Sequence, residues 1–237
     1  IHTAKGFSGM RGFFYTFNLV NFKQNIQYLS LFIVMTFIVS CKAQVVQDTK
    51  PLYSNNEWRT ATANTYFKDF GNDLVKLVGT WVYTENLERF EISLALKEQY
   101  TGNLTLSGLQ FDQDMLYGEY KYNNEQGEEL LKSLGELQSS TDPYEHLIKG
   151  NYITNINNTE LCETCTNELA VKLHIDDPQR DYIPYRMYIQ HIPASSQGNP
   201  VEQIRLVIRI NDMTIVPEGV PTDTRIRLGF YTLNKVE

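Results

Sequence analysis

The stretch RFEISLALK, residues 89–97, alternates apolar side chains with polar or small ones along its whole length. Phe90, Ile92, Leu94 and Leu96 all fall on one side of this alternation. Successive side chains of a β-strand point to opposite faces, so a period of two predicts a strand with one buried and one solvated face. Because antiparallel sheets commonly expose one face to water, the stretch favours an antiparallel architecture.

The same alternation recurs in LAVKLHI (169–175), IRLVIRI (204–210) and TRIRLGFYTL (224–233). In the last of these, Ile226, Leu228 and Phe230 are expected on the buried face. Weaker strand patterns cover residues 80–84, 103–109, 115–122, 147–154 and 185–192. About eight to ten strands separated by turn-rich segments predict a mainly β domain, a closed antiparallel barrel or a sandwich, over residues 57–237.

A helix is expected at the start of this domain, from Glu57 to Leu77, at least in its second half, which lies in NTYFKDFGNDLVKLV (64–78). Phe67, Phe70, Leu74 and Leu77 are spaced by three and four residues, which places them on one face of a helix. Asn64 precedes them as a suitable N-cap. The sequence therefore predicts a leading helix followed by the strands.

The N-terminal region carries an export signal pattern. The run YLSLFIVMTFIV (28–39) is almost wholly apolar, Lys23 precedes it, and residues 1–40 contain no acidic side chain. An apolar run of this length is typical of a signal-peptide core rather than of a membrane-spanning helix. The next residues complete the sequence Ile-Val-Ser-Cys (38–41), which resembles the lipobox of bacterial lipoproteins. That resemblance implies acylation of Cys41 and removal of residues 1–40. An uncleaved anchor helix and a buried core helix remain alternatives.

Residues 41–56 follow as a polar, proline-containing segment, which predicts a flexible tether between the lipid and the folded domain. The expected partner is thus a membrane, reached through Cys41. The expected location is the cell envelope, at the outer membrane, facing either the periplasm or the surface.

The charge balance argues against nucleic acid as a partner. The whole chain has a formal net charge of −7, and residues 1–40 hold three of its 21 basic residues and none of its 28 acidic ones, which leaves −10 for the remainder. A chain with this charge is repelled by phosphate backbones.

A Gly-Thr-Trp sequence, Gly79 to Trp81, heads the first expected strand. It resembles the Gly-x-Trp signature that opens lipocalins. The resemblance implies an eight-stranded barrel in which Trp81 closes one end and a basic side chain lies across the indole. By their place late in the chain, Arg225 or Arg227 is expected to supply that cation, in a structural role.

The whole layout is similar to lipoproteins of flavobacterial type. The features that carry this similarity are Cys-Lys-Ala-Gln at 41–44, Val-Gly-Thr-Trp at 78–81 and the turn Asp-Pro-Gln-Arg at 177–180, spread over residues 38–237. That family has no assigned activity, so the similarity implies location and fold rather than chemistry.

Cys162 and Cys165 form a Cys-x-x-Cys pair in the segment LCETCTNE. In an exported protein such a pair is readily oxidised, and we interpret it first as a structural disulfide. A redox pair requires a helix start after a strand, which this segment does not offer. A metal site, a redox pair and free thiols stay open as alternatives; His174 is the nearby candidate ligand for a metal.

No catalytic motif is evident, and no cofactor is expected. The pair Asp112 and Asp114 resembles the opening of a calcium loop, but Leu116 and Tyr117 stand where a ligand and a glycine are needed. A group of tyrosines offers contact area for a ligand or partner if several of them line one barrel mouth, and otherwise covers sheet faces. These are the tyrosines at 83, 100, 117, 120, 122, 152, 182, 185 and 188.

These observations predict a membrane-tethered, non-enzymatic module that binds a small apolar ligand or an envelope protein. One alternative is an envelope- or carbohydrate-acting hydrolase that uses paired carboxylates. A second is an immunity or structural lipoprotein that blocks a protein partner through an acidic face.

Overall fold

A computed structural model describes most of the domain. The described residues are 47–52, 61–102, 110–161, 168–194, 198, 200–211 and 216–236. Cys41, Cys162, Cys165, the signal segment and the strand expected at 103–109 lie outside these residues.

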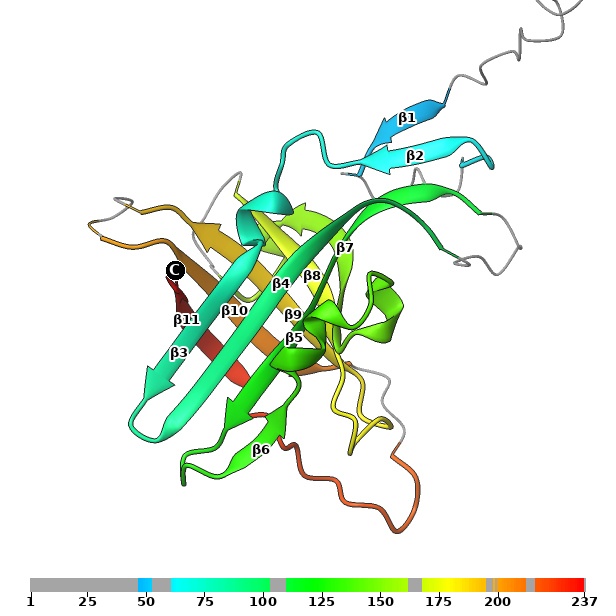
Figure 1. Cartoon of the computed structure of the whole chain (residues 1–237). Coiled ribbons are helices and arrows are strands. Elements are labelled where there is room, and N and C mark those ends of the chain that lie inside the picture. Colours follow the sequence, from blue (N-terminus) through cyan, green and yellow to red (C-terminus); the bar gives the residue numbers. More distant parts are fainter. Residues whose placement is uncertain are drawn as a thin grey trace, which may run out of the picture. The chain divides into compact units, whose positions relative to one another are not determined.

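Eight antiparallel strands form a closed ring (Figure 1). They are β3 (Gly79–Glu85), β4 (Glu88–Thr101), β5 (Asp112–Asn123), β7 (Ile148–Asn155), β8 (Leu169–Ile175), β9 (Tyr185–Ile192), β10 (Gln203–Ile210) and β11 (Gly229–Val236). Each strand of the ring pairs with the ring strand that follows it, and β11 returns to β3. The predicted antiparallel barrel is confirmed, and the sandwich alternative is wrong.

Among the described residues, three short strands and four 3-10 turns lie outside the ring. Strand β1 (Asp48–Pro51) pairs in parallel with β2 (Thr65–Lys68), which joins the start of β5. Strand β6 (Glu129–Lys132) pairs with the end of β5. The 3-10 turns are η2 (Val75–Leu77), η3 (Leu134–Gln138), η4 (Pro143–Glu145) and η5 (Ile156–Asn158).

The barrel interior is formed by the alternating apolar residues that the sequence marks. In β4, Phe90, Ile92 and Leu94 are buried, and their register partners Tyr122, Tyr120 and Gly118 belong to β5. The alternate residues of β8 and β10 are buried in the same way. The ring is thus a single apolar core, since one buried cluster includes residues from all eight strands.

The two ends of the barrel are both covered from within the chain. At the first end, where β3 begins, Leu74 and Leu77 of the segment around η2 are fully buried in the core. At the second end, where β3 turns into β4, Ile226 is buried in the same core. An eight-stranded barrel has an interior just wide enough for side chains to fill, and such covers complete the packing.

The helix predicted at the start of the domain is wrong in the described part, residues 61–78. Thr65–Lys68 is strand β2, and only Val75–Leu77 forms a single 3-10 turn. Asn72 adopts a positive φ of 52°, which a helix does not allow. The Leu74 amide donates a hydrogen bond to the Asp69 carboxylate at 2.7 Å, and this bond to a side chain takes the place of a helical backbone hydrogen bond.

Part of the segment predicted as a flexible tether is instead ordered, because Asp48–Pro51 is strand β1. Gln47 donates a hydrogen bond to Asp112 at 2.8 Å, and Tyr66 of β2 donates one to Asp114 at 2.5 Å. The two aspartates that resembled a calcium loop therefore fasten this N-terminal arm to β5.

Glycines sit at the seam where β5 meets β7, which closes the ring through three register pairs. A Cβ atom on Gly118 would lie 2.4 Å from the Ser93 carbonyl oxygen of β4. Gly150 has a φ of 148°, and a Cβ there would lie 3.0 Å from the Lys172 carbonyl oxygen of β8. Each glycine thus allows its strand to approach the neighbour on the side away from the seam, β4 for Gly118 and β8 for Gly150.

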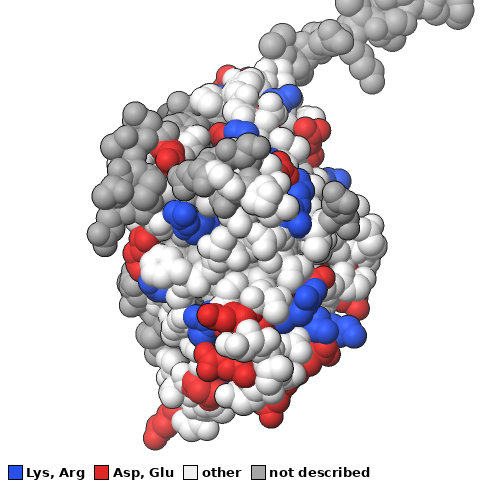
Figure 2. Space-filling view, turned by 90° about the vertical axis from the view of Figure 1, so that its left-hand side faces the viewer, with Lys and Arg blue, Asp and Glu red and all other residues white. Residues whose placement is uncertain are grey.

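The face of the molecule seen in Figure 2 carries its charges unevenly. Acidic side chains gather towards the lower part of this view, whereas the middle of the face is mostly uncharged. On this face, negative charge is therefore not spread uniformly.

Candidate functional site

The Trp81 residue expected to close the barrel lies at the first end and is fully buried. Its indole nitrogen donates a hydrogen bond to the Leu77 carbonyl oxygen at 2.8 Å. The cation that faces its ring is Lys235, with Nζ 5.2 Å from the ring centroid. Gly79 has a φ of 127°, and a Cβ there would lie 3.3 Å from Lys235 Cε.

Arg225 and Arg227 were the wrong choices for that cation, because both lie at the second end. They precede β11, whereas Lys235 is the register partner of Trp81 near the end of β11. A strand that runs from the second end to the first carries its last residues, not its first, to the indole.

Arg227 instead neutralises a carboxylate buried in the barrel. Its Nε donates to Glu88 Oε1 at 2.9 Å, and Tyr122 donates to the same oxygen at 2.8 Å. The guanidinium carbon lies 4.6 Å from the ring centroid of Tyr231. The hydrogen bond to Glu88 raises the pKa of Arg227, and burial followed by Glu88 raises the pKa of Tyr122 to about 12. The hydrogen bonds of this cluster thus hold the Glu88 carboxylate and the Arg227 guanidinium in fixed positions.

Arg225 plays a similar part with the Asp-Pro-Gln-Arg turn. Its Nη1 donates to Asp177 Oδ1 at 2.6 Å, and the Gln179 amide donates to that oxygen at 3.0 Å. The Arg180 amide donates to the Asp177 carbonyl oxygen at 2.9 Å, which forms the turn. The motif that carried part of the family resemblance is thus a structural fastening between the β8–β9 turn and the segment before β11.

Large side chains fill the barrel interior, so a small apolar ligand has little room there. The largest fully buried ones are Trp81, Tyr120, Tyr185, Tyr231 and Phe90. Because these side chains occupy the interior, a binding site is expected on the outside of the ring.

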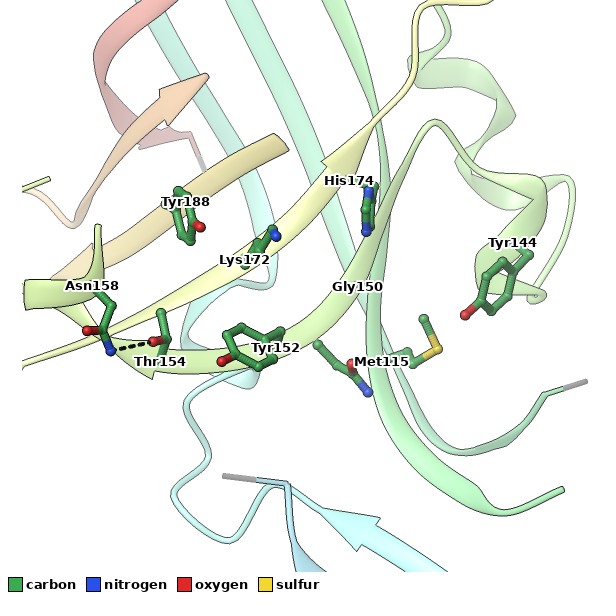
Figure 3. A pocket seen from close by; sticks show the side chains of 10 residues that line it. Met115, Tyr144, Gly150, Tyr152, Thr154, Asn158, Lys172, His174 and Tyr188 are labelled. Atoms are coloured by element: carbon green, nitrogen blue, oxygen red, sulfur yellow. Dashed lines mark hydrogen bonds between the residues drawn. The ribbon is translucent and has the colours of Figure 1, made fainter. Parts of the chain in front are cut away.

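A groove with a volume of about 710 Å³ lies on the outer surface of β7, β8 and β9 (Figure 3). It is lined by Met115, Tyr144, Gly150, Asn151, Tyr152, Thr154, Asn158, Lys172, His174 and Tyr188. Three of these residues are tyrosines, and none of the described lining residues is Asp or Glu. The groove therefore combines aromatic surface with hydrogen-bonding groups and positive charge.

Its floor contains a straight row of side chains across three strands. Tyr152 of β7 is the register partner of Lys172 of β8, and Lys172 is the partner of Tyr188 of β9. Lys172 Nζ lies 6.0 Å from the ring centroid of Tyr188. Because side chains opposite each other on neighbouring strands share a face, the row presents two phenol rings on either side of one ammonium group.

Tyr144 forms the opposite wall and enters the groove from η4 (Figure 3). The Asp142 carboxylate caps the start of η4 by accepting a hydrogen bond from the Tyr144 amide at 2.9 Å. The ring of Tyr144 lies 5.8 Å from that of Tyr100 on β4. Tyr144 is 43% exposed and Tyr152 44%, so both rings remain accessible from solvent.

A buried pair of side chains positions the segment that carries Tyr144. His146 Nδ1 and Glu119 Oε1 lie 2.9 Å apart, and His146 Nε2 lies 3.2 Å from the Ser140 carbonyl oxygen. The imidazole therefore bridges the Glu119 carboxyl group and the Ser140 carbonyl oxygen. This pair pins the segment from η3 to η4 onto the outer face of β5.

The amide groups of the groove are oriented by the fold. Asn151 donates to the Gln113 side-chain oxygen at 2.9 Å and to the Asp114 carbonyl oxygen at 2.8 Å. Asn158 donates to the Thr154 hydroxyl at 3.1 Å, as the dashed line in Figure 3 shows. These contacts fix the side chains before any ligand arrives, which lowers the entropic cost of binding.

The electrostatic character of the groove is positive at Lys172 and neutral at His174 near pH 7. Desolvation by neighbouring groups lowers the pKa of the His174 imidazole, although part of this side chain is exposed. The positive charges of Lys172 and Lys149 lower that pKa further. Asp176 acts in the opposite direction. Lys149, the register partner of His174, is paired with Asp176.

A second hollow of about 510 Å³ lies at the first end, beside β8 and β9. It has an apolar floor that includes Val171 and Ile189, and a rim of mixed charge that includes Asp73, Lys76 and Arg205. Its charges largely offset one another, and no tyrosine lines it among the described residues. The outer groove is therefore the better candidate for a specific site.

The sequence identified only part of this groove. Tyr152 and Tyr188 belong to the tyrosine group noted from composition, whereas Tyr120, Tyr122 and Tyr185 are interior. Tyr144 and Lys172 were missed, because nothing local to them indicates that β7, β8 and η4 meet. The alternation of side chains gave one indication, because it places Lys172 and Tyr188 on the outer face of strands whose inner residues are apolar.

Within the described residues, no cluster of three or more His, Cys, Asp or Glu side chains is placed to hold a metal ion. In the same part of the chain, no helix has both the length and the apolar character needed to cross a membrane.

Together the filled interior and the lateral groove define a small antiparallel β-barrel protein whose candidate site lies on the wall of the barrel. The model of a family of unknown function, DUF6705, matches residues 23–235, and the chain belongs to this family. No curated protein and no solved structure matched the chain.

Proposed function

We propose that the protein is a lipid-anchored envelope protein whose barrel is a non-enzymatic binding module. Its binding site is the outer groove, and its membrane attachment is an acylated Cys41. The observation that carries the binding role is the row Tyr152, Lys172 and Tyr188, displayed on the outside of a barrel with a filled interior.

The anchor is supported by the order of the N-terminal features. A basic residue, a short apolar core and a Cys after Ile-Val-Ser precede the domain in the order that lipoprotein export requires. Strand β1 begins at Asp48, so only six residues, 42–47, separate Cys41 from this strand. At no more than about 3.6 Å per residue, this segment keeps the strand within roughly 20 Å of the lipid.

The groove is better suited to binding than to acid–base hydrolysis. A hydrolase of the type considered above needs two carboxylates across a cleft. The most buried carboxylates are held elsewhere: Glu88 by Arg227, Asp114 by Tyr66, Glu119 by His146 and Asp177 by Arg225. The described residues that line the groove supply no carboxylate at all.

The anchor and the site are tested separately, both with the full chain. A clickable fatty acid fed to expressing cells is expected to label the wild type and not Cys41→Ser. Labelling of both proteins to the same extent would contradict acylation at Cys41.

For the site, solubilised wild-type protein is incubated with an envelope extract from the producing cells, and the retained components are compared with those of Tyr152→Ala/Tyr188→Ala. Phe230→Ala is the matched control, because Phe230 is an exposed aromatic residue on another strand. We expect retention to be lost only in the double variant. Equal retention by all three proteins would exclude the groove as the binding site.

A further inference from the structure

The row in the floor of the groove has the form of a binding site for sugar rings. Neighbouring strands lie about 4.8 Å apart, so the backbones of Tyr152 and Tyr188 are separated by roughly 10 Å, with Lys172 between them. A sugar ring has an apolar face of C–H groups and an edge of hydroxyl groups. Phenol rings suit the face, while Asn151, Asn158 and the phenol hydroxyls suit the edge.

The charge of the groove indicates which sugars. The chain as a whole is acidic, at −7, yet the described lining residues include one lysine and no carboxylate. A positive site on an acidic protein favours an anionic ligand and excludes competing cations. One ammonium group matches a singly charged carboxylate, whereas phosphate groups are commonly held by arginine forks or clusters, and no arginine lines the groove among the described residues.

The dimensions favour a chain over a single sugar. The groove extends across three strands, and Tyr144 forms a further aromatic wall beyond Met115.

We propose that the groove binds a carbohydrate chain that carries carboxylate groups, with Lys172 at a carboxylate and Tyr152 and Tyr188 against sugar faces. This inference rests on the proposed binding function and specifies its ligand.

The test is a calorimetric titration of the solubilised full chain with three probe groups. The first group contains short oligomers of galacturonate, of mannuronate and of hyaluronan. The second is fully methyl-esterified oligogalacturonate, which keeps the sugar rings without charge. The third is a poly-glutamate peptide of matched charge. We expect at least one acidic oligosaccharide to bind with a Kd about tenfold lower than the ester or the peptide.

Variants then assign the contributions. Lys172→Met should raise the Kd of the acidic oligosaccharide to that of an uncharged one, while Tyr152→Ala should weaken charged and ester forms alike. Lys132→Met is the control, because Lys132 is an exposed lysine on β6, outside the groove. Thermal unfolding of each variant verifies the fold.

Three results would overturn the inference: no binding by any acidic oligosaccharide, equal binding of acid and ester, or equal binding of the peptide. In such a case the envelope-extract experiment separates two outcomes. If Tyr152→Ala/Tyr188→Ala does not retain the envelope component that the wild type retains, only the carbohydrate assignment fails. If the double variant retains that component, the proposed binding site fails as well.

Discussion

At the scale of single residues, Gly118 shows how little space separates β5 from β4. Gly118 has no room for a Cβ, since the nearest backbone oxygen would be 2.4 Å away and Leu94 Cδ2 2.7 Å away. Real Cβ atoms are not found this close to backbone, so an added methyl group must push β4 and β5 apart.

Gly118→Ala is therefore expected to destabilise the barrel by roughly 1–3 kcal/mol, the usual cost of overpacking. The measurement is the urea midpoint, with Gly135→Ala as control, because a Cβ at Gly135 meets no atom within 4 Å. Equal midpoints for the two variants would show that β4 and β5 accommodate the added methyl group without a loss of stability.

Residue parity also explains where the sequence predicted faces correctly and where it did not. Alternation in β4, β8 and β10 identified the buried side chains. The alternating stretch of β4 lies before that strand's register shift between Lys97 and Tyr100, and β8 and β10 each pair with β9 in continuous register. In the last segment Phe230 was assigned to the interior, but it is 51% exposed, and Tyr231 and Leu233 are buried instead. Strand β11 begins only at Gly229, whose φ of 131° separates it from the preceding residues.

At the scale of elements, the segment from η3 to η4 depends on the buried His146 and Glu119 pair. Removing only the histidine leaves the buried Glu119 carboxyl group with only a long hydrogen bond from the Leu147 amide, at 3.4 Å, among the described residues, and a buried charge that loses its main partner is costly. The same segment carries Tyr144, so its loosening affects one wall of the groove.

His146→Leu is expected to lower the free energy of unfolding by about 3–5 kcal/mol and to speed amide exchange in residues 133–146. His146→Leu/Glu119→Leu should recover a large part of that loss, because no charge remains unpaired. The measurements are denaturant unfolding and hydrogen exchange. A double variant less stable than the single one would refute this account.

Elements whose conformation is decided by distant contacts could not be predicted locally. The residues around η2 have helical spacing, yet hydrogen bonds from the Asp69 amide and the Tyr66 hydroxyl to Asp114 hold this stretch against β5. The arginines before β11 are another case, because their carboxylate partners, Glu88 and Asp177, lie 139 and 48 positions away in the chain.

At the scale of the whole molecule, the barrel followed from strand count and alternation, whereas its closure did not. Only three register pairs join β5 to β7, and no local pattern marks them. The groove is harder still to predict, since its residues come from four strands and two 3-10 turns, and only the finished ring brings them together.

Two histidines link the stability of the whole molecule to pH. Burial lowers the pKa of His174 and that of His191 below the ordinary value of about 6.5. Lys172 and Lys149 oppose protonation of His174, and Lys235 and Lys76 oppose that of His191, while Asp176 and Glu202 favour it. The unfolded chain therefore takes up protons first as the pH falls below about 6.5, and stability is lost there.

We expect the wild type to lose more stability between about pH 7.5 and pH 5.5 than the variant His174→Gln/His191→Gln. Comparing the two proteins cancels the titration of all other groups. The measurement is the urea midpoint at each pH. Parallel pH profiles would rule out a role for these imidazoles.

The even number of alternating strands brings β11 back to the rim where β3 starts, with Val236 opposite Thr80. A tag fused after β11 would consequently emerge at this rim, near the strand that the N-terminal arm leads into. A biosensor chip that captures the protein by such a tag would hold it by one rim and leave the side wall facing the flow of analyte.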